Sequence, residues 1–270
     1  MSIRLLGLDV DGTLCDPFKQ VTPGVRAALG RAREAGLAVA ICSGRHPFNV
    51  DELVGELGLP RTAVCLSGAY VELDGREVYR HALPGTLIGR AVGAVAACGC
   101  YCSLSGSSFN LTAGHIDRGP NAMAPSMRRY EAFDTYDELV DAARAHEGEV
   151  LKMAIHGQDD ASYERVRELL ARIEGIQVAR SDTRWVDVTA PGCTKALGIE
   201  KLAEALGVTI DEVAAVGDDE NDVEVIGLVG LGIAMGNATP EVKERARVVV
   251  ADNAHDGCAE AIDLAIARSR

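Results

Sequence analysis

The sequence predicts an α/β fold in which a parallel-sheet core is interrupted by a separate α+β domain. Three observations support this prediction. In the first third of the 270 residues, short apolar runs alternate with helical segments, as in a parallel sheet joined by crossovers. The middle third instead alternates polar and apolar residues, as antiparallel strands with one solvated face do. The parallel-sheet pattern then returns after residue 188.

The helices of the first third are marked by start and stop signals. Thr22-Pro23 combines an N-cap residue with proline at the first helical position, and Gly36 ends that helix. The apolar runs between the helical segments are too short for helices and fit buried strands. The expected strands are Ile3–Leu8, Leu37–Cys42 and Val64–Leu66, and a second helix is expected over 47–57.

The middle third has a different pattern of polar and apolar residues. Tyr101 to Leu111 and Leu151 to His156 alternate polar and apolar residues, and helices are expected over 136–145 and 162–173. This predicts an antiparallel sheet with helices on one face. The segment 114–125 is rich in Gly, Pro and Asn and is expected to be a mobile loop.

The last third returns to buried runs separated by helices. A helix is expected from Lys195 to Leu206, and another begins at Thr239-Pro240. Buried strands are expected over 213–216, 232–235 and 247–251.

The domain boundaries follow from these changes of pattern. Residues 1–83 and 188–270 are predicted to form one Rossmann-like core, because strands from both ends of the chain can share one parallel sheet. Residues 84–187 are predicted to form an inserted α+β cap domain.

Composition and charge narrow the classes of partner. The net charge of −13 and the pI of about 4.9 disfavour nucleic acid, because phosphate backbones attract basic surfaces. Asp9 and Asp11 interrupt the early apolar run, so no signal peptide is expected. The uncharged stretch 91–114 contains Gly, Ser and Asn and is a poor membrane span. We therefore expect a cytoplasmic protein with a small-molecule partner.

The eight cysteines allow two readings. Cys98, Cys100 and Cys102 alternate, which in a strand would put three sulfurs on one face and could serve a metal or redox role. There is no Cys-x-x-Cys and no paired His spacing nearby. Reduced structural thiols are therefore favoured.

Asp9 and Asp11 directly follow the first expected strand. Residues i and i+2 of an extended backbone point to the same side, so both carboxylates emerge together at the strand's carboxyl end. Open α/β sheets bind their ligands at that edge. Two carboxylates this close repel unless a cation lies between them or one holds a proton. The alternative is a polar strand end with a capping Asp.

Polar groups also follow other strands of the predicted parallel sheet. Ser43-Gly44-Arg45 follows the second strand, Asp218 to Asp222 follow the strand at 213–216, and Lys195 opens the helix before it. Because parallel strands end at one rim, these groups are expected to meet, and together they suit Mg²⁺ and a phosphate. A carboxylate there could attack phosphorus, while Mg²⁺ and Lys195 neutralise the repulsion between the anions.

The order of these motifs resembles the haloacid dehalogenase superfamily of phosphotransferases. Asp-x-Asp-Gly-Thr comes first, followed by hydrophobic-Ser-Gly-Arg, then Lys, then Gly-Asp-x-x-Asn-Asp. The tail from Gly232 to Lys243, followed by 253–257, resembles the Cof-type branch in particular. The resemblance spans the core domain, and over the cap it rests on position and size.

The resemblance implies a role for each matching residue. Asp9 would be the nucleophile and a magnesium ligand, and Asp11 the general acid/base and a ligand through its backbone carbonyl. Asp9 would stay ionised while Asp11 holds a proton, with the metal separating their pKa values. Asp218 would be a further carboxylate ligand of magnesium. Asp222 would either bind magnesium through water or orient Lys195. The implied phosphate or substrate contacts are Ser43, Gly44, Arg45, Lys195 and Asn221.

The resemblance implies a Mg²⁺-dependent phosphatase that hydrolyses a sugar phosphate or a phosphoglycolate-like acid through an aspartyl-phosphate. The cap would exclude water and select the leaving group. One alternative is a phosphomutase or sugar-phosphate transferase, and another is a phosphometabolite-binding protein without turnover. The last would predict loss of a motif acid, and none is missing. Arg45 could equally pair with a surface acid, and His115 could contact substrate or lie on the surface.

Overall fold

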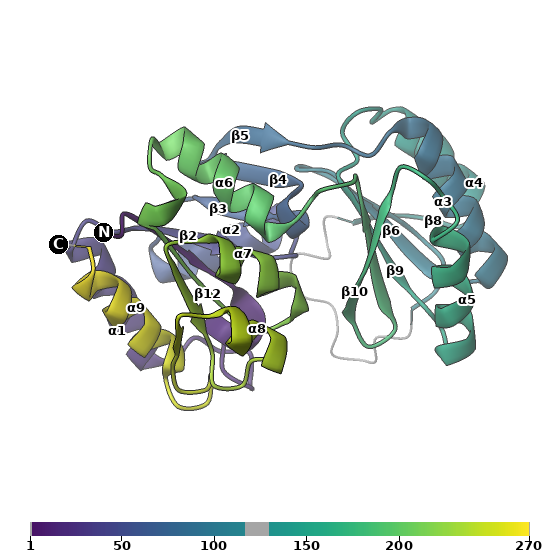
Figure 1. Cartoon of the computed structure of the whole chain (residues 1–270). Coiled ribbons are helices and arrows are strands. Elements are labelled where there is room, and N and C mark those ends of the chain that lie inside the picture. The colour runs from purple at the N-terminus through teal and green to yellow at the C-terminus, as the bar shows by residue number, and fades with distance from the viewer. Residues whose placement is uncertain (1, 117–129, 270) are drawn as a thin grey trace. The chain divides into compact units, whose positions relative to one another are not determined.

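The computed structural model describes residues 2–116 and 130–269, which form two compact units (Figure 1). The first unit contains residues 1–45, 50–79 and 194–270, and the second contains residues 46–49 and 80–193. That the second unit acts as a cap stays a prediction.

The first unit is built on a sheet of eight strands in the order β14-β13-β12-β1-β2-β3-β4-β5. All pairs from β14 to β3 are parallel, and β4 pairs antiparallel with β3. The strands are β1 (Leu5–Leu8), β2 (Ala38–Cys42), β3 (Ala63–Cys65), β4 (Tyr70–Leu73), β5 (Arg76–Arg80), β12 (Val213–Gly217), β13 (Leu231–Ala234) and β14 (Val248–Val249).

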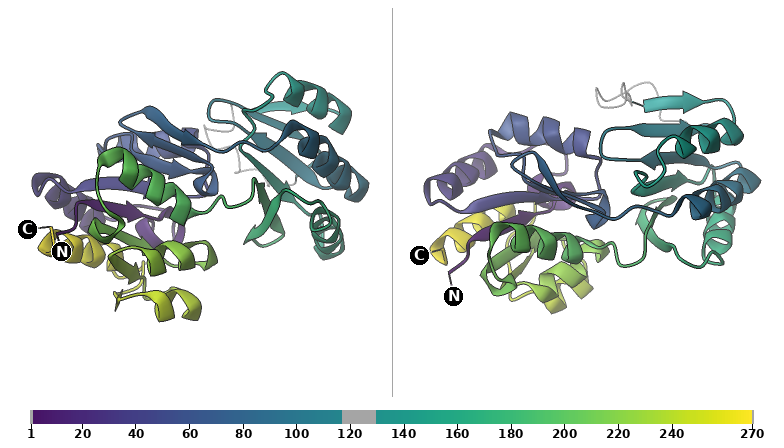
Figure 2. Two further views of the ribbon diagram at one scale, coloured as in Figure 1. Left: turned by 45° about the horizontal axis from the view of Figure 1, so that its top comes forward. Right: turned by 90° about the horizontal axis from the view of Figure 1, so that it is seen from above.

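Helices cover both faces of this sheet, as Figure 2 shows, with α1 and α9 on one face and α6 and α7 on the other. Both faces of β1 and β12 are therefore buried, which explains their continuous apolar runs. The helices are α1 (Pro23–Glu34), α2 (Pro47–Leu57), α6 (Lys195–Leu206), α7 (Val223–Leu228), α8 (Pro240–Arg245) and α9 (Gly257–Ala267). The predicted α/β class with a parallel core sheet is confirmed.

The second unit is built on a sheet of six strands in the order β10-β11-β9-β6-β7-β8. Its pairs are antiparallel except for β7 with β8. Helices α3, α4 and α5 lie on one face (Figure 1). The elements are α3 (Gly85–Cys98), β6 (Tyr101–Ser105), β7 (Asn110–Ala113), β8 (Tyr130–Phe133), α4 (Tyr136–Arg144), β9 (Lys152–His156), α5 (Asp160–Leu170), β10 (Gln177–Asp182) and β11 (Trp185–Thr189).

The two faces of the second sheet differ in chemistry. Alternate residues such as Cys102 and Leu104 of β6 pack into an apolar core with the helices. The residues between them face the other way and are polar, yet they are buried. This polar face contains Ser103, Ser105, Asn110, Thr112, Lys152, Asp187 and Thr189.

Two expectations for the middle third need correction. Cys98 ends helix α3, so Cys98, Cys100 and Cys102 do not share one strand. All eight cysteines are free thiols, and burial raises the pKa of those at 42, 65 and 102, which keeps them neutral. Residues 101–111, expected as one alternating stretch, form β6 and β7, which pair antiparallel.

Most of the loop expected over 114–125 lies outside the described residues, and His115, in its described part, is exposed. Within residues 2–116 and 130–269, no helix is long and apolar enough to cross a bilayer.

Candidate active site

Asp9 and Asp218 lie at the same edge of the first sheet. β1 and β12 are parallel neighbours with Leu8 opposite Val216, and each carboxylate directly follows its strand. The amide of Asp9 donates to the carbonyl of Val216 at 3.0 Å, which continues the ladder into the site. Ligand oxygens of Asp9, Asp218 and Asp222 all lie within 4.8 Å of one another. The predicted meeting of these acids at one rim is therefore observed.

Lys195 is the cation at the centre of this cluster. Its ammonium donates to one oxygen of Asp9 and one of Asp222, at 2.7 Å each, and the residue is 2% exposed. Thr194 caps helix α6 by accepting from the amide of Leu197, which fixes Lys195 in the first turn. A lysine at a helix start usually lies in solvent, and only its place in the motif order predicted otherwise.

Asp222 is held from two sides. One oxygen accepts from Lys195, and the other accepts from the backbone amides of Asp218 and Asp219 at 3.1 and 3.3 Å. Gly217 makes room for this arrangement, since a Cβ there would lie 2.3 Å from the carboxyl carbon of Asp222. Asp222 is also 1% exposed and more deeply buried than Asp218, and it contacts Lys195 directly, which favours an orienting role over direct ligation.

The cluster carries more negative than positive charge, with three carboxylates around one ammonium. Burial, with repulsion from Asp222 and Asp218, raises the pKa of Asp9 to about 7 against the attraction of Lys195. Burial also raises the pKa of Asp218 to about 6, although Thr13 donates a hydrogen bond to it. Burial acts to lower the pKa of Lys195, but Asp222 and Asp9 outweigh it and raise that pKa above its usual range. Hard oxygens with surplus negative charge fit a divalent cation.

Asp11 points to a different set of partners. Arg45 donates to both of its oxygens, at 2.9 and 2.8 Å, and Lys19 donates to one of them at 2.8 Å. Burial acts to raise the pKa of Asp11, but these hydrogen bonds and charges outweigh it and lower the pKa to about 2. In the protein alone, the pKa order of Asp9 and Asp11 is therefore the reverse of the expected one. The sequence left two possible partners for Arg45, a surface acid or the substrate. In the structure, Arg45 pairs with an acid, Asp11.

The remaining predicted residues lie around this rim in different ways. Ser43 is 2% exposed, and its hydroxyl accepts from the backbone amide of Arg45 at 3.2 Å. Gly44 follows it and is half-buried. Asn221 is exposed on the turn after β12.

Asn237 was not assigned a role from the sequence. Its side-chain amide donates to the carbonyl of Gly12 at 2.9 Å and to one carboxylate oxygen of Asp218 at 3.2 Å. Its carbonyl oxygen accepts from the amide of Asn253 at 3.0 Å. Thr13 donates to the other oxygen of Asp218 at 2.8 Å. The sequence did contain a signal for this contact. Residues 235–237 follow β13, the strand beside β12, so they end at the same edge of the sheet as Asp218.

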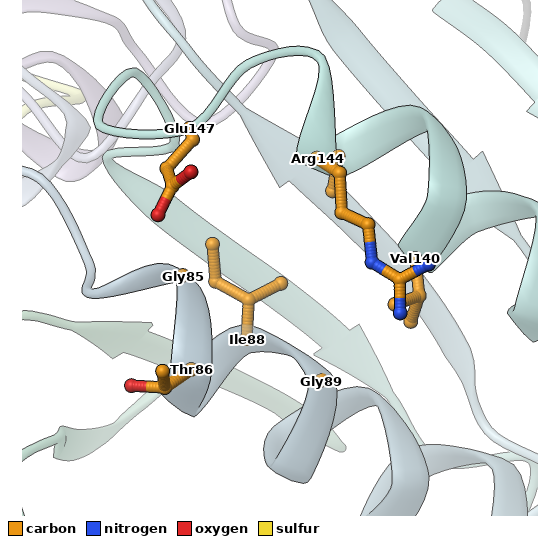
Figure 3. Close-up of a pocket in the computed structure, with 8 residues that line it drawn as sticks. Gly85, Thr86, Ile88, Gly89, Val140, Arg144 and Glu147 are labelled. Atoms are coloured by element: carbon orange, nitrogen blue, oxygen red, sulfur yellow. The ribbon is translucent and has the colours of Figure 1, made fainter.

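A cavity of about 470 Å³ lies elsewhere, between α3 and α4 of the second unit (Figure 3). Gly85 and Gly89 leave the space, and Glu147 and Arg144 are its charged side chains. Arg144 is paired with Asp141, so the cavity offers no free cation among its described residues to a phosphate.

Comparisons with known proteins agree with this geometry. Residues 6–262 match the family described as haloacid dehalogenase-like hydrolase. The Escherichia coli pyridoxal phosphate phosphatase YbhA is 30% identical over 271 residues, which cover 97% of this chain and 98% of YbhA. The Bacillus subtilis 5-amino-6-(5-phospho-D-ribitylamino)uracil phosphatase YcsE is 28% identical, with coverage of 97% and 95%.

The fold is similar to that of a solved haloacid dehalogenase-like hydrolase. A crystal structure of a haloacid dehalogenase-like hydrolase from Bacteroides thetaiotaomicron matches with a TM-score of 0.82 and 28% identity, covering 97% of this chain and 99% of that one. The aspartate cluster, the motif order and the extent of these matches lead to one conclusion. This chain belongs to the haloacid dehalogenase-like hydrolases and is an enzyme of the phosphoric monoester hydrolase class.

Proposed function

We propose that this enzyme hydrolyses a small phosphorylated metabolite through an aspartyl-phosphate on Asp9, with Mg²⁺ as its cofactor. The observation that supports this most is the contact between the buried ammonium of Lys195 and Asp9. Asp218 lies beside Asp9, so charged groups meet at the edge of a parallel sheet. Asp9 and Asp218 would hold the divalent ion, together with the backbone carbonyl of Asp11. The ion would supply positive charge against the phosphoryl oxygens.

In the first step, a carboxylate oxygen of Asp9 attacks phosphorus, and the bond from phosphorus to the leaving oxygen breaks. Asp11 gives a proton to that leaving oxygen once it is released from Arg45 and Lys19, whose contacts lower its pKa in the protein alone. Lys195 lies 2.7 Å from Asp9, where its charge offsets the approach of two anions. Ser43 and the amide of Gly44 are proposed to hold the phosphoryl oxygens, with Arg45 and Asn221 as further substrate contacts.

In the second step, Asp11 takes a proton from water, and the water oxygen attacks phosphorus. The acyl-phosphate bond breaks, releasing inorganic phosphate and restoring the Asp9 carboxylate. Asp222 is proposed to orient Lys195, because both of its oxygens accept hydrogen bonds within the protein.

The second unit is proposed to select the leaving group. The polar face of its sheet supports this, because it carries a buried ion pair between Lys152 and Asp187 with hydroxyl side chains beside it. Such groups discriminate between substrates through their hydrogen bonds. Replacing Lys152 by Met should change the ranking of substrates more than the rate on a generic aryl phosphate. An unchanged ranking would remove this role.

The substrate is proposed to be a sugar phosphate or a phosphoglycolate-like acid, and the relatives add pyridoxal phosphate and a phosphorylated ribitylaminouracil as candidates. A screen of inorganic phosphate release over a panel of such esters with Mg²⁺ tests this. We expect turnover on at least one ester, lost in Asp9→Asn with the fold intact and nearly lost in Asp11→Asn. Turnover by Asp9→Asn would contradict the nucleophile assignment. Phosphate retained on an acceptor hydroxyl would indicate a phosphomutase instead.

A further inference from the structure

Asn110 lies on the polar face of the second unit's sheet. It is the first residue of β7 and pairs with Ser105 of β6, which in turn pairs with Lys152 of β9. Asn110 is 3% exposed, and its side-chain oxygen accepts no hydrogen bond within the described part of the chain. A buried acceptor without a donor is costly, and such groups are rare in folded proteins.

Folding stability does not explain an amide at this position. Leucine has the same number of side-chain heavy atoms and would leave no acceptor unpaired. Asparagine is also disfavoured in strands, where β-branched and aromatic residues pack better. Ser105 lies directly opposite Asn110, yet its hydroxyl does not donate to this oxygen. The oxygen is therefore available to a donor that the described residues do not supply, such as a ligand.

The two charged members of the polar face balance each other. Lys152 and Asp187 form an ion pair at 2.5 Å, and their side chains are 8% and 10% exposed. A carboxylate that bound here would lose its hydration and then compete with Asp187 for the ammonium. The hydroxyl groups of the face can both donate and accept. The face therefore favours an uncharged ligand with hydroxyl or N–H groups over an anion.

We propose that Asn110 is a specificity-determining residue, whose side-chain oxygen accepts a hydrogen bond from a hydroxyl or N–H group of an uncharged leaving group. The inference rests on the proposed function, in which the second unit selects the leaving group. It narrows the substrate class to phosphate esters of polyols and similar neutral alcohols. Phosphoglycolate-like acids do not fit, because their leaving group has a carboxylate and no further donor. A site built to bind a hydroxyl group rejects analogues that lack it.

Three six-carbon esters form matched probes for this class. Sorbitol 6-phosphate has hydroxyl groups along its chain, n-hexyl phosphate has none, and 6-phosphogluconate has the hydroxyl groups together with a terminal carboxylate. The ratio of their kcat/KM values measures how well the enzyme discriminates between them. For the wild type with Mg²⁺, we expect kcat/KM on sorbitol 6-phosphate to exceed that on each of the other two by about ten-fold or more.

The test variant is Asn110→Leu, which removes the acceptor. We expect an unchanged or raised Tm, a loss of about ten-fold or more in kcat/KM on sorbitol 6-phosphate, and less than about three-fold on n-hexyl phosphate. Asn110→Ala, which needs no additional room, should show the same kinetic split. Asn110→Asp keeps an acceptor oxygen and should retain most of the activity on sorbitol 6-phosphate.

Thr62→Val is the matched control for a buried acceptor that has a donor. Thr62 is 4% exposed, and its hydroxyl accepts from the amide of Asp74 at 3.2 Å. Its replacement should lower the Tm, because that amide loses its partner, and should leave the ratio of the two esters unchanged.

Equal losses on sorbitol 6-phosphate and n-hexyl phosphate in Asn110→Leu and Asn110→Ala, or no loss at all, would overturn the inference. So would a wild type that prefers either of the other two esters or hydrolyses none of the three. Asp9→Asn, measured on the same esters, separates these results from failure of the proposed mechanism. An inactive Asp9→Asn without a split in the Asn110 variants refutes the role of Asn110 alone. Phosphate release by Asp9→Asn refutes the mechanism, whichever way the Asn110 variants divide.

Discussion

Replacing Lys195 by Met removes an ammonium that touches both Asp9 and Asp222. The three side chains are 1%, 9% and 2% exposed, and each contact is 2.7 Å. Breaking a buried ion pair by removing one partner costs about 3–5 kcal/mol, because the partner charge stays buried without compensation. Measured against a typical total of about 5–15 kcal/mol for a folded protein, this is a large fraction of the stability.

The stability that Lys195→Met loses should grow with pH. Burial raises the pKa of Asp9 to about 7 even beside Lys195, and removing the ammonium raises that pKa further. A carboxyl whose folded-state pKa is raised loses its contribution to stability as pH rises from its unfolded value through the folded one. The deficit of Lys195→Met should therefore be smaller at pH 5 than at pH 8.

Urea unfolding of the whole chain without added Mg²⁺ measures the deficit. Lys201→Met is the matched control, since Lys201 lies on the same helix with its side chain 33% exposed and pairs along the helix with Glu204. The stability that Lys201→Met loses should be a small fraction of the stability that Lys195→Met loses. A loss in Lys195→Met as small as that of the control, at both pH values, would refute the electrostatic reasoning.

Three further outcomes are expected. Gly68→Ala should lower the Tm and the activity together, because φ is 91° there and a Cβ would lie 1.9 Å from the carbonyl oxygen of Thr194, which caps helix α6. Mg²⁺ should raise the Tm in differential scanning calorimetry more at pH 8 than at pH 5. Protons compete with the ion for Asp9 and Asp218, because the pKa values of these carboxyls are raised to about 7 and about 6. An equal rise of the Tm at both pH values would contradict the proposed ligands. Asn237→Ala should weaken Mg²⁺ binding by about ten-fold or more in titration calorimetry, because it orients Asp218; unchanged affinity would remove that role.

The parts of the structure that the sequence predicted best are those set by local signals. Helix α6 runs from Lys195 to Leu206 as expected, because Thr194 caps its start and Gly207, at φ 66°, ends it. The meeting of Asp9 and Asp218 was also predictable, since parallel strands end at one rim.

Other features depend on contacts that no local pattern carries. Helix α3 was missed because glycines at 85, 89 and 93 lower helix propensity and its stretch has little charge to mark a solvent face. The contact of Lys19 with Asp11 follows from a left-handed turn, and that of Asn237 with Gly12 joins segments 225 residues apart.

The central claim is that Asp9 receives the phosphoryl group. The most direct measurement is rapid acid quenching during turnover, followed by tandem mass spectrometry of the peptide that contains Asp9 and Asp11. The account predicts one phosphoryl group on Asp9 in the wild type and none in Asp9→Asn. A phosphoryl group on Asp11, or on the Asp9→Asn protein, would contradict it.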